Sequence, residues 1–228
     1  MLNNPYIGTQ KESSLHRALK VRYTGSEGDT ETVVGQYLCD GRTGKGELIE
    51  VQCGSFGPLK EKVKKLAREN KVRVIHPIIA KKYIELYDVQ GCLLRRRKSP
   101  LKGSDWDVFK SLVHAPKLPL LKNLTIELAI IESVEKRTND GKGSWRRCGV
   151  SKNDHLLDAW CGSVVLKMPK DYYRFIPFAQ DEPFTTRELA EKAGINKALA
   201  QKTLYVLTQM GLAERRGIRG RTNIFVRI

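Results

Sequence analysis

The chain has 228 residues, of which 40% are hydrophobic, and its formal net charge is +16. This composition permits a buried core and excludes global disorder, while the excess of cations favours a polyanionic partner, nucleic acid before a membrane surface. No apolar run is long enough to span a bilayer, and the first residues lack the cationic start and apolar core of a signal peptide, which predicts a cytoplasmic protein with no membrane partner.

The first part of the chain predicts the order helix, β-meander, helix, strand. Apolar residues recur at helical spacing between residues 10 and 23. Short apolar runs separated by glycines predict strands at 33–34, 37–38 and 48–51. Pro58 starts a second predicted helix that ends near residue 70, because proline is favoured in the first helical turn. The β-branched run 72–75 predicts a fourth strand, which Pro77 ends.

The middle of the chain carries two basic clusters. Arg95, Arg96 and Arg97 stand in a predicted exposed loop, and Arg146 and Arg147 follow Trp145 directly. We expect these arginines to bind DNA, with an ordinary solvated loop as the alternative for each cluster. We expect Trp145 to be buried. Five scattered cysteines without a Cys-x-x-Cys pair argue against a disulfide scaffold and a zinc ribbon.

Residues 185–226 predict a winged helix-turn-helix. A threonine caps a short helix that Gly194 ends, Asn196 caps a second helix that Gly211 ends, and two strands follow. In such a domain the second helix enters the major groove and the wing contacts the DNA backbone or minor groove. The exposed candidates on the helix are Asn196, Lys197, Gln201 and Lys202, and those in the wing are Arg215, Arg216, Arg219 and Arg221. The alternative is a winged helix that binds protein.

Two acidic residues stand on neighbouring predicted strands. Glu50 and Gln52 are two apart, so their side chains leave the strand on one face, and the glycine-rich turn lets Asp40 lie beside them. Two carboxylates and a backbone carbonyl, that of Val51, suit Mg²⁺ or Mn²⁺, which activates water against a phosphodiester. The alternative is that Asp40 starts a turn and Glu50 is a solvated strand residue.

Glu12, His16 and Lys20 are spaced by four residues and would share one face of the first helix. We predict that Lys20 is simply exposed. For His16, phosphate contact, proton transfer near neutral pH and ordinary packing all stay open.

On these residues the first domain resembles the PD-(D/E)XK nuclease superfamily, in the variant where glutamine replaces the motif lysine. The resemblance spans roughly residues 9–80, and most of the chain is similar to a bacterial family with a Glu-x-Gln motif and a C-terminal winged helix. It implies a restriction-endonuclease-like α/β core with Asp40 and Glu50 at the metal. It also places Gln52 at the lysine position, Glu12 as support from the first helix and Lys62 as the missing cation.

The sequence therefore predicts a nuclease-like domain with basic insertions at 1–168 and a winged-helix domain at 169–228. The predicted function is Mg²⁺- or Mn²⁺-dependent hydrolysis of phosphodiester bonds in double-stranded DNA, in repair or defence, by a monomer or homodimer. A non-catalytic DNA-binding regulator that keeps the fold is the alternative. An RNA nuclease is a third alternative, which the winged helix disfavours.

Overall fold

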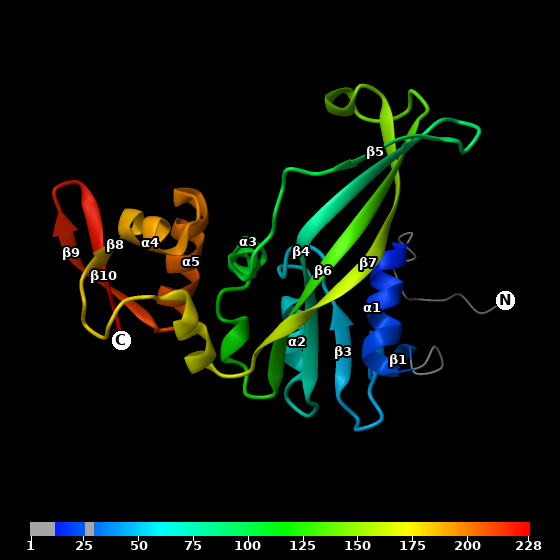
Figure 1. Ribbon diagram of the computed structural model, residues 1–228. Helices are drawn as coiled ribbons and strands as arrows, with labels where there is room; N and C mark the ends of the chain where they lie inside the picture. The colour runs from blue at the N-terminus through cyan, green and yellow to red at the C-terminus, as the bar shows by residue number, and fades with distance from the viewer. Residues whose placement is uncertain (1–11, 26–29) are drawn as a thin grey trace. The chain divides into compact units, whose positions relative to one another are not determined.

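The structure is a computed structural model that describes residues 12–25 and 30–228 (Figure 1). It belongs to the α/β class, with a mixed seven-stranded sheet, helices, and a three-stranded antiparallel sheet near the C terminus. The strands of the large sheet hydrogen-bond in the order β1-β2-β3-β4-β6-β7, and β5 pairs with β4. The chain forms two compact units, and β4, β6 and β7 each have residues in both.

The first unit contains residues up to Val51, Ile79–Gly103 and Ala129–Gly162. Its complete elements are α1 (Ser14–Thr24), β1 (Thr30–Val34), β2 (Tyr37–Arg42), β3 (Leu48–Val51) and β5 (Leu93–Lys98). The strands shared with the second unit are β4 (Val72–Tyr87), β6 (Leu124–Asn139) and β7 (Val150–Leu166). Helix α1 packs on β2 and β3 through Leu15 and Leu19, which are buried.

Local sequence explains the start of this unit. The Ser13 side chain caps α1 by accepting a hydrogen bond from the backbone N–H of His16, and Gly25 ends the helix at φ 85°. Strands β1 and β2 are antiparallel, with Val34 opposite Tyr37, so only two residues form the turn. Gly35 occupies that turn at φ 57°, a conformation that glycine adopts without steric cost. The predicted β-meander is therefore present.

The second unit contains Gln52–Ile78, Ser104–Leu128 and Ser163–Ile228. Its helices are α2 (Lys60–Leu66), α3 (Val108–Leu112), α4 (Thr186–Ala193) and α5 (Lys197–Gln209). Its small sheet has the order β8-β10-β9, from β8 (Phe184–Thr185), β9 (Ala213–Arg219) and β10 (Thr222–Arg227). Phe175 lies at the centre of an aromatic group, with ring centroids 4.8 Å from Phe109 and 5.1 Å from Trp106.

The element order predicted for residues 185–226 is observed. Thr185 and Glu188 form a capping box at the start of α4, with N–H to oxygen distances of 3.2 Å and 2.6 Å. Gly194 ends α4 at φ 64°, and the side chain of Asn196 starts α5 by accepting a hydrogen bond from Leu199 at 2.9 Å. Strands β9 and β10 then form an antiparallel hairpin in which Arg219 lies opposite Thr222.

Three of the sequence predictions were wrong. Strand β4 continues through Pro77, because Ile75 and Ile78 are buried on either side and their burial outweighs one missing hydrogen-bond donor. Arg95, Arg96 and Arg97 lie on strand β5 and not in a loop, although they are exposed as expected. Trp145 is 83% exposed, in a 3₁₀ turn at Trp145–Arg147.

Within residues 12–25 and 30–228, no helix is both long and apolar enough to cross a membrane.

Candidate functional site

The β2–β3 hairpin brings two acidic residues to one place. Gly41 pairs with Ile49 in antiparallel register, so one step along each strand Asp40 lies opposite Glu50, on the same face of the sheet. Asp40 Oδ2 also accepts a hydrogen bond from the backbone N–H of Val51 at 2.7 Å. Glu50 is only 4% exposed. Asp40 is thus a strand residue and Glu50 a buried one, which removes the alternative of a turn and a solvated strand.

Helix α1 adds a lysine and a histidine to the hairpin. Lys20 Nζ lies 3.3 Å from Glu12 Oε1 and 3.7 Å from Asp40 Oδ1. His16 Nε2 lies 3.2 Å from Asp40 Oδ2 and 3.6 Å from Glu12 Oε1. We call these four residues, Glu12, His16, Lys20 and Asp40, the α1–β2 cluster. All four belong to the first compact unit.

Two predictions about the α1–β2 cluster need correction. Lys20 was expected to be exposed, but its side chain is 7% exposed, because the helix turns it toward the hairpin carboxylates. Glu12 was placed on the first helix, whereas α1 begins at Ser14 after the cap Ser13, so Glu12 lies just before it. For His16, the structure shows a contact with the carboxylate of Asp40.

The surroundings of Asp40 favour its charged form. Burial raises the pKa of its carboxyl group, but the contact with His16, the Val51 N–H and the charge of Lys20 lower it, and the net pKa lies below the ordinary value. Asp40 is therefore a carboxylate at neutral pH. Its negative charge is compensated by protein groups from α1, so this part of the site is electrostatically satisfied by the chain itself.

Whether a metal ion fits depends on the donor atoms and on Lys20. Carboxylates from Glu12, Asp40 and Glu50 are the oxygen ligands that Mg²⁺ and Mn²⁺ prefer. In the described part of the chain, however, no three His, Cys, Asp or Glu side chains surround a common point as a metal site requires. The donor chemistry fits a divalent ion, and the position of Lys20 between Glu12 and Asp40 opposes it.

Two other predicted site residues belong to the second compact unit. The Gln52 side chain donates a hydrogen bond to the carbonyl oxygen of Ser55 at 2.6 Å. The backbone N–H of Gln52 donates a hydrogen bond to the carbonyl oxygen of Ile75 at 2.8 Å. Lys62 lies in α2 and is half-buried. The predicted roles of Gln52 and Lys62 in positioning water and phosphate stay predictions.

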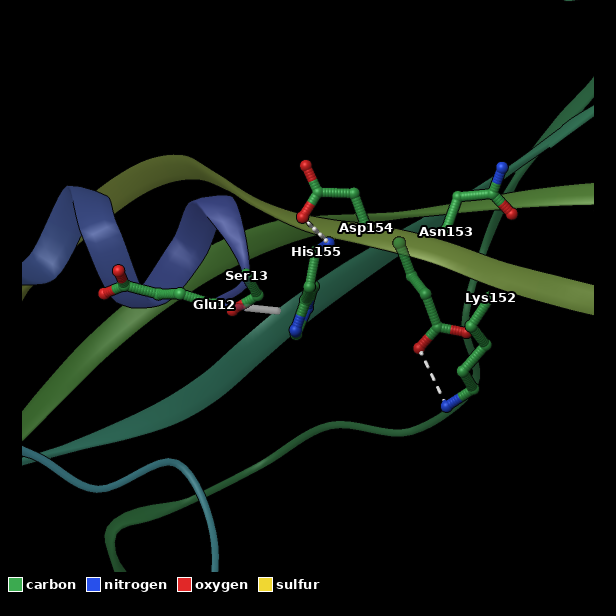
Figure 2. Close-up of a pocket in the computed structure, with 7 residues that line it drawn as sticks. Glu12, Ser13, Lys152, Asn153, Asp154 and His155 are labelled. Carbon is green, nitrogen blue, oxygen red and sulfur yellow. Dashed lines mark hydrogen bonds and ion pairs between the residues drawn. The ribbon is translucent and has the colours of Figure 1, made fainter. Parts of the chain in front are cut away.

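A pocket of about 460 Å³ adjoins the α1–β2 cluster, because Glu12 lines both. Figure 2 shows Glu12 and Ser13 at one end of this pocket and Lys152 at the other, with Asp154 and His155 between them. Asp154 holds the start of α1 by accepting hydrogen bonds from the backbone N–H of Ser14 at 3.0 Å and from its hydroxyl at 2.5 Å. Strand β7, which carries Asp154, therefore holds the start of α1, the helix that carries His16 and Lys20.

Glu135 is the most strongly perturbed acid in this pocket. Burial raises the pKa of its carboxyl group, but ion pairs with Arg137 and Lys82 lower it to about 2. Lys82 lies 3.1 Å away and Lys152 lies 3.5 Å away. Sequence reasoning missed Glu135, since only the pairing of distant strands collects these cations around it.

Comparison with known proteins assigns most of the chain to one family. The model of a family described as a domain of unknown function, DUF8091, matches residues 13–167. The chain belongs to this family. The DUF8091 domain runs from the cap of α1 to just past the end of β7, and it contains His16, Lys20, Asp40 and Glu50.

Neither the description of the family nor that of a similar protein names an activity. A relative from Treponema pallidum (strain Nichols), described as an uncharacterized protein, is 30% identical over 140 residues. That similarity covers 61% of this chain and 56% of the relative, so it spans little more than half of either protein. No solved structure matches the chain.

The DUF8091 domain carries the two basic clusters predicted from the sequence. Arg96 stacks over the ring of Tyr83 at 4.7 Å and lies 3.6 Å from Glu85. Arg146 lies over the exposed ring of Trp145 at 5.4 Å. Both clusters thus combine a guanidinium with an aromatic ring at the surface, a combination that suits stacking on nucleic-acid bases.

Beyond the DUF8091 domain, α5 exposes one polar face. Lys197, Gln201 and Lys202 are exposed on it, and Tyr205, 49% exposed, continues this face by one turn. Sequence reasoning missed Tyr205, although its spacing of four from Gln201 gave the signal. The side-chain oxygen of Asn196 accepts the hydrogen bond that starts α5, so this oxygen serves the fold.

The four predicted wing arginines are exposed but differ in their partners. Arg216 lies 2.9 Å from Asp181 and 3.1 Å from Glu214, and Arg219 lies 3.3 Å from Glu188. For Arg215 and Arg221, no carboxylate among the described residues lies at ion-pair distance.

Proposed function

We propose that this protein is a DNA endonuclease that depends on Mg²⁺ or Mn²⁺. The observation that carries this proposal is the α1–β2 cluster, where Glu12, just before α1, and Asp40 of the β2–β3 hairpin both contact Lys20, with buried Glu50 opposite Asp40. The arrangement supports a restriction-endonuclease-like core. When bound, the metal would activate water and stabilise negative charge on the phosphate.

The chain's own residues have separate roles in this proposal. Asp40, Glu50 and the carbonyl of Val51 would hold the metal, with Glu12 in support. The bond from the Val51 N–H orients the carboxylate of Asp40, and its low pKa keeps it charged in neutral solution. For Gln52 and Lys62, the sequence resemblance implies roles in positioning water and phosphate.

Binding of double-stranded DNA is supported by the C-terminal residues. Helices α4 and α5 pack together, and the β9–β10 hairpin follows α5 directly, which is the order of a winged helix. In that case α5 enters the major groove with Lys197, Gln201 and Lys202, and Arg215 and Arg221 contact phosphates. The basic residues of β5 and the Trp145–Arg147 turn add contacts from the DUF8091 domain.

A second candidate function is a non-catalytic DNA-binding regulator. The observation that favours it is the compensation of Glu12 and Asp40 by Lys20 and His16, which completes the cluster without a metal ion. In that case the cluster stabilises the fold, and only the winged helix and the basic surfaces act.

A cleavage assay separates the two functions. Wild type, Asp40→Asn and the control Glu69→Gln, an exposed carboxylate, are incubated with plain, mismatched, methylated and branched duplexes in Mg²⁺, Mn²⁺ or EDTA. We expect metal-dependent cleavage by wild type and control, and a loss of at least about a hundredfold in Asp40→Asn. Equal DNA binding by all three proteins without cleavage of any substrate would refute the nuclease and support the regulator.

A further inference from the structure

We propose that Lys20 is the internal counter-cation of the Glu12–Asp40 pair and that a divalent metal ion binds there only by displacing it. The inference rests on the proposed metal site and adds a residue that controls its occupancy. Lys20 thus lowers the affinity of the site for metal, beside His16, which contacts the same two carboxylates.

The position of Lys20 shows that it is held by charge. Its side chain is only 7% exposed, and its ammonium group lies within 4 Å of carboxylates from Glu12, Asp40 and Glu31. A buried ammonium is costly unless it is paired, so these carboxylates account for its location. Conversely, Asp40 would lose a compensating cation if Lys20 left.

A metal ion held by Asp40, with Glu12 in support, would compete with the ammonium group of Lys20 for these two carboxylates. Two positive groups close together in a partly buried site repel each other strongly. The metal can therefore bind well only after Lys20 has moved away. Glu31, whose side chain is 64% exposed, lies 3.7 Å from Lys20 and offers a partner nearer to solvent.

Removal of the lysine charge should therefore strengthen metal binding. We would titrate Mn²⁺, followed by its paramagnetic resonance signal and by thermal unfolding, into wild type, Lys20→Met, Lys20→Gln and Lys20→Arg. We expect Lys20→Met and Lys20→Gln to bind Mn²⁺ at least about tenfold more tightly than wild type. Lys20→Arg keeps the charge and should bind as weakly as wild type.

Thermal unfolding gives a second result from the same samples. In EDTA, Lys20→Met should unfold at a lower temperature than wild type, because Asp40 has lost a counter-charge. Mn²⁺ should restore more of the unfolding temperature in Lys20→Met than it adds to wild type. Lys81→Met is the matched control, since Lys81 pairs with a single carboxylate, that of Glu132, at 2.9 Å on the same unit. It should show no such gain.

A measurement on wild type does not depend on whether a Lys20 variant folds. The rate of Lys20 acetylation, followed by mass spectrometry, should rise about tenfold when Mg²⁺ displaces the buried ammonium toward solvent. Unchanged acetylation in saturating Mg²⁺, or Mn²⁺ binding by Lys20→Gln no tighter than by wild type, would overturn the inference.

The outcomes also distinguish this inference from the nuclease proposal. Tighter Mn²⁺ binding by the Lys20 variants, with no DNA cleavage by wild type, would refute the nuclease and leave the counter-cation role standing. Metal-dependent cleavage that is lost in Asp40→Asn, with equal Mn²⁺ affinity in wild type and Lys20→Gln, would do the reverse.

Discussion

The four exposed wing arginines give a prediction that separates those with ion pairs from those without. Arg216 pairs with Asp181 and Glu214, and Arg219 pairs with Glu188, whereas no ion pair with a described carboxylate is found for Arg215 or Arg221. If the wing contacts DNA phosphates, the arginines that form no ion pair with the described carboxylates should supply most of its charge. We therefore compare the double variant Arg215→Ala/Arg221→Ala with the control Arg216→Ala.

The expected losses of DNA affinity and of its salt dependence follow from the number of phosphates that each variant leaves without an arginine. One unit charge 4 Å from another contributes about 1 kcal/mol in water, so the removal of two arginine–phosphate pairs weakens binding by about 2 kcal/mol, or roughly thirtyfold. Each neutralised phosphate adds about 0.9 to the slope of log affinity against log salt, so the double variant should lower that slope by about 1.8. Arg216→Ala should lower it by less than about 0.5, because the side chain is already neutralised.

Fluorescence anisotropy of a labelled duplex, at several salt concentrations, measures both quantities. Circular dichroism of the variants shows that the hairpin still folds. Equal slopes for wild type and the double variant would show that the wing does not contact phosphate. A larger loss in Arg216→Ala than in the double variant would show that the ion pairs in the structure do not decide which arginines bind.

Two predictions concern stability. The pKa of Glu135 is about 2, below its ordinary 4.5, so its ion pairs stabilise the fold above pH 4.5 and are lost as the pH falls toward 2. Allowing for solvent screening, we expect about 1–2 kcal/mol, and Glu135→Gln should flatten the fall in the free energy of unfolding between pH 5 and pH 2, measured by urea. An equally steep fall would contradict this. Thr185→Ala removes the cap of α4 and should cost about 1 kcal/mol, and an unchanged urea midpoint would show that the capping box contributes nothing.

Local sequence patterns predicted the hairpins and the C-terminal elements. Glycines fix the tight turns, and Thr185 and Asn196 cap helices in the way their side chains favour. Asp40 and Glu50 were placed together because a short hairpin fixes which residues face each other. In each case the deciding interaction lies within about ten residues.

Long-range contacts were not accessible to the same reasoning. The helical periodicity predicts that Leu15 and Leu19 face the core. It does not predict which residues beside them on α1 face the β2–β3 hairpin, so the sequence alone places Lys20 at the surface. The cations around Glu135 come from β4, β6 and β7, whose pairing the sequence does not reveal. The exposed Trp145 departs from the general tendency of large aromatic side chains to be buried.

The bond between Ser14 and Asp154 has a consequence for synthesis on the ribosome. It joins residues 140 apart in sequence, near the two ends of the DUF8091 domain. Within this domain α1 is translated before its anchor on β7, which exists only when almost the whole domain has been made, and contacts of this separation form slowly. His16 and Lys20 are thus made well before the strand that anchors their helix. A nascent chain that stops before residue 154 therefore lacks the bonds that hold the start of this helix.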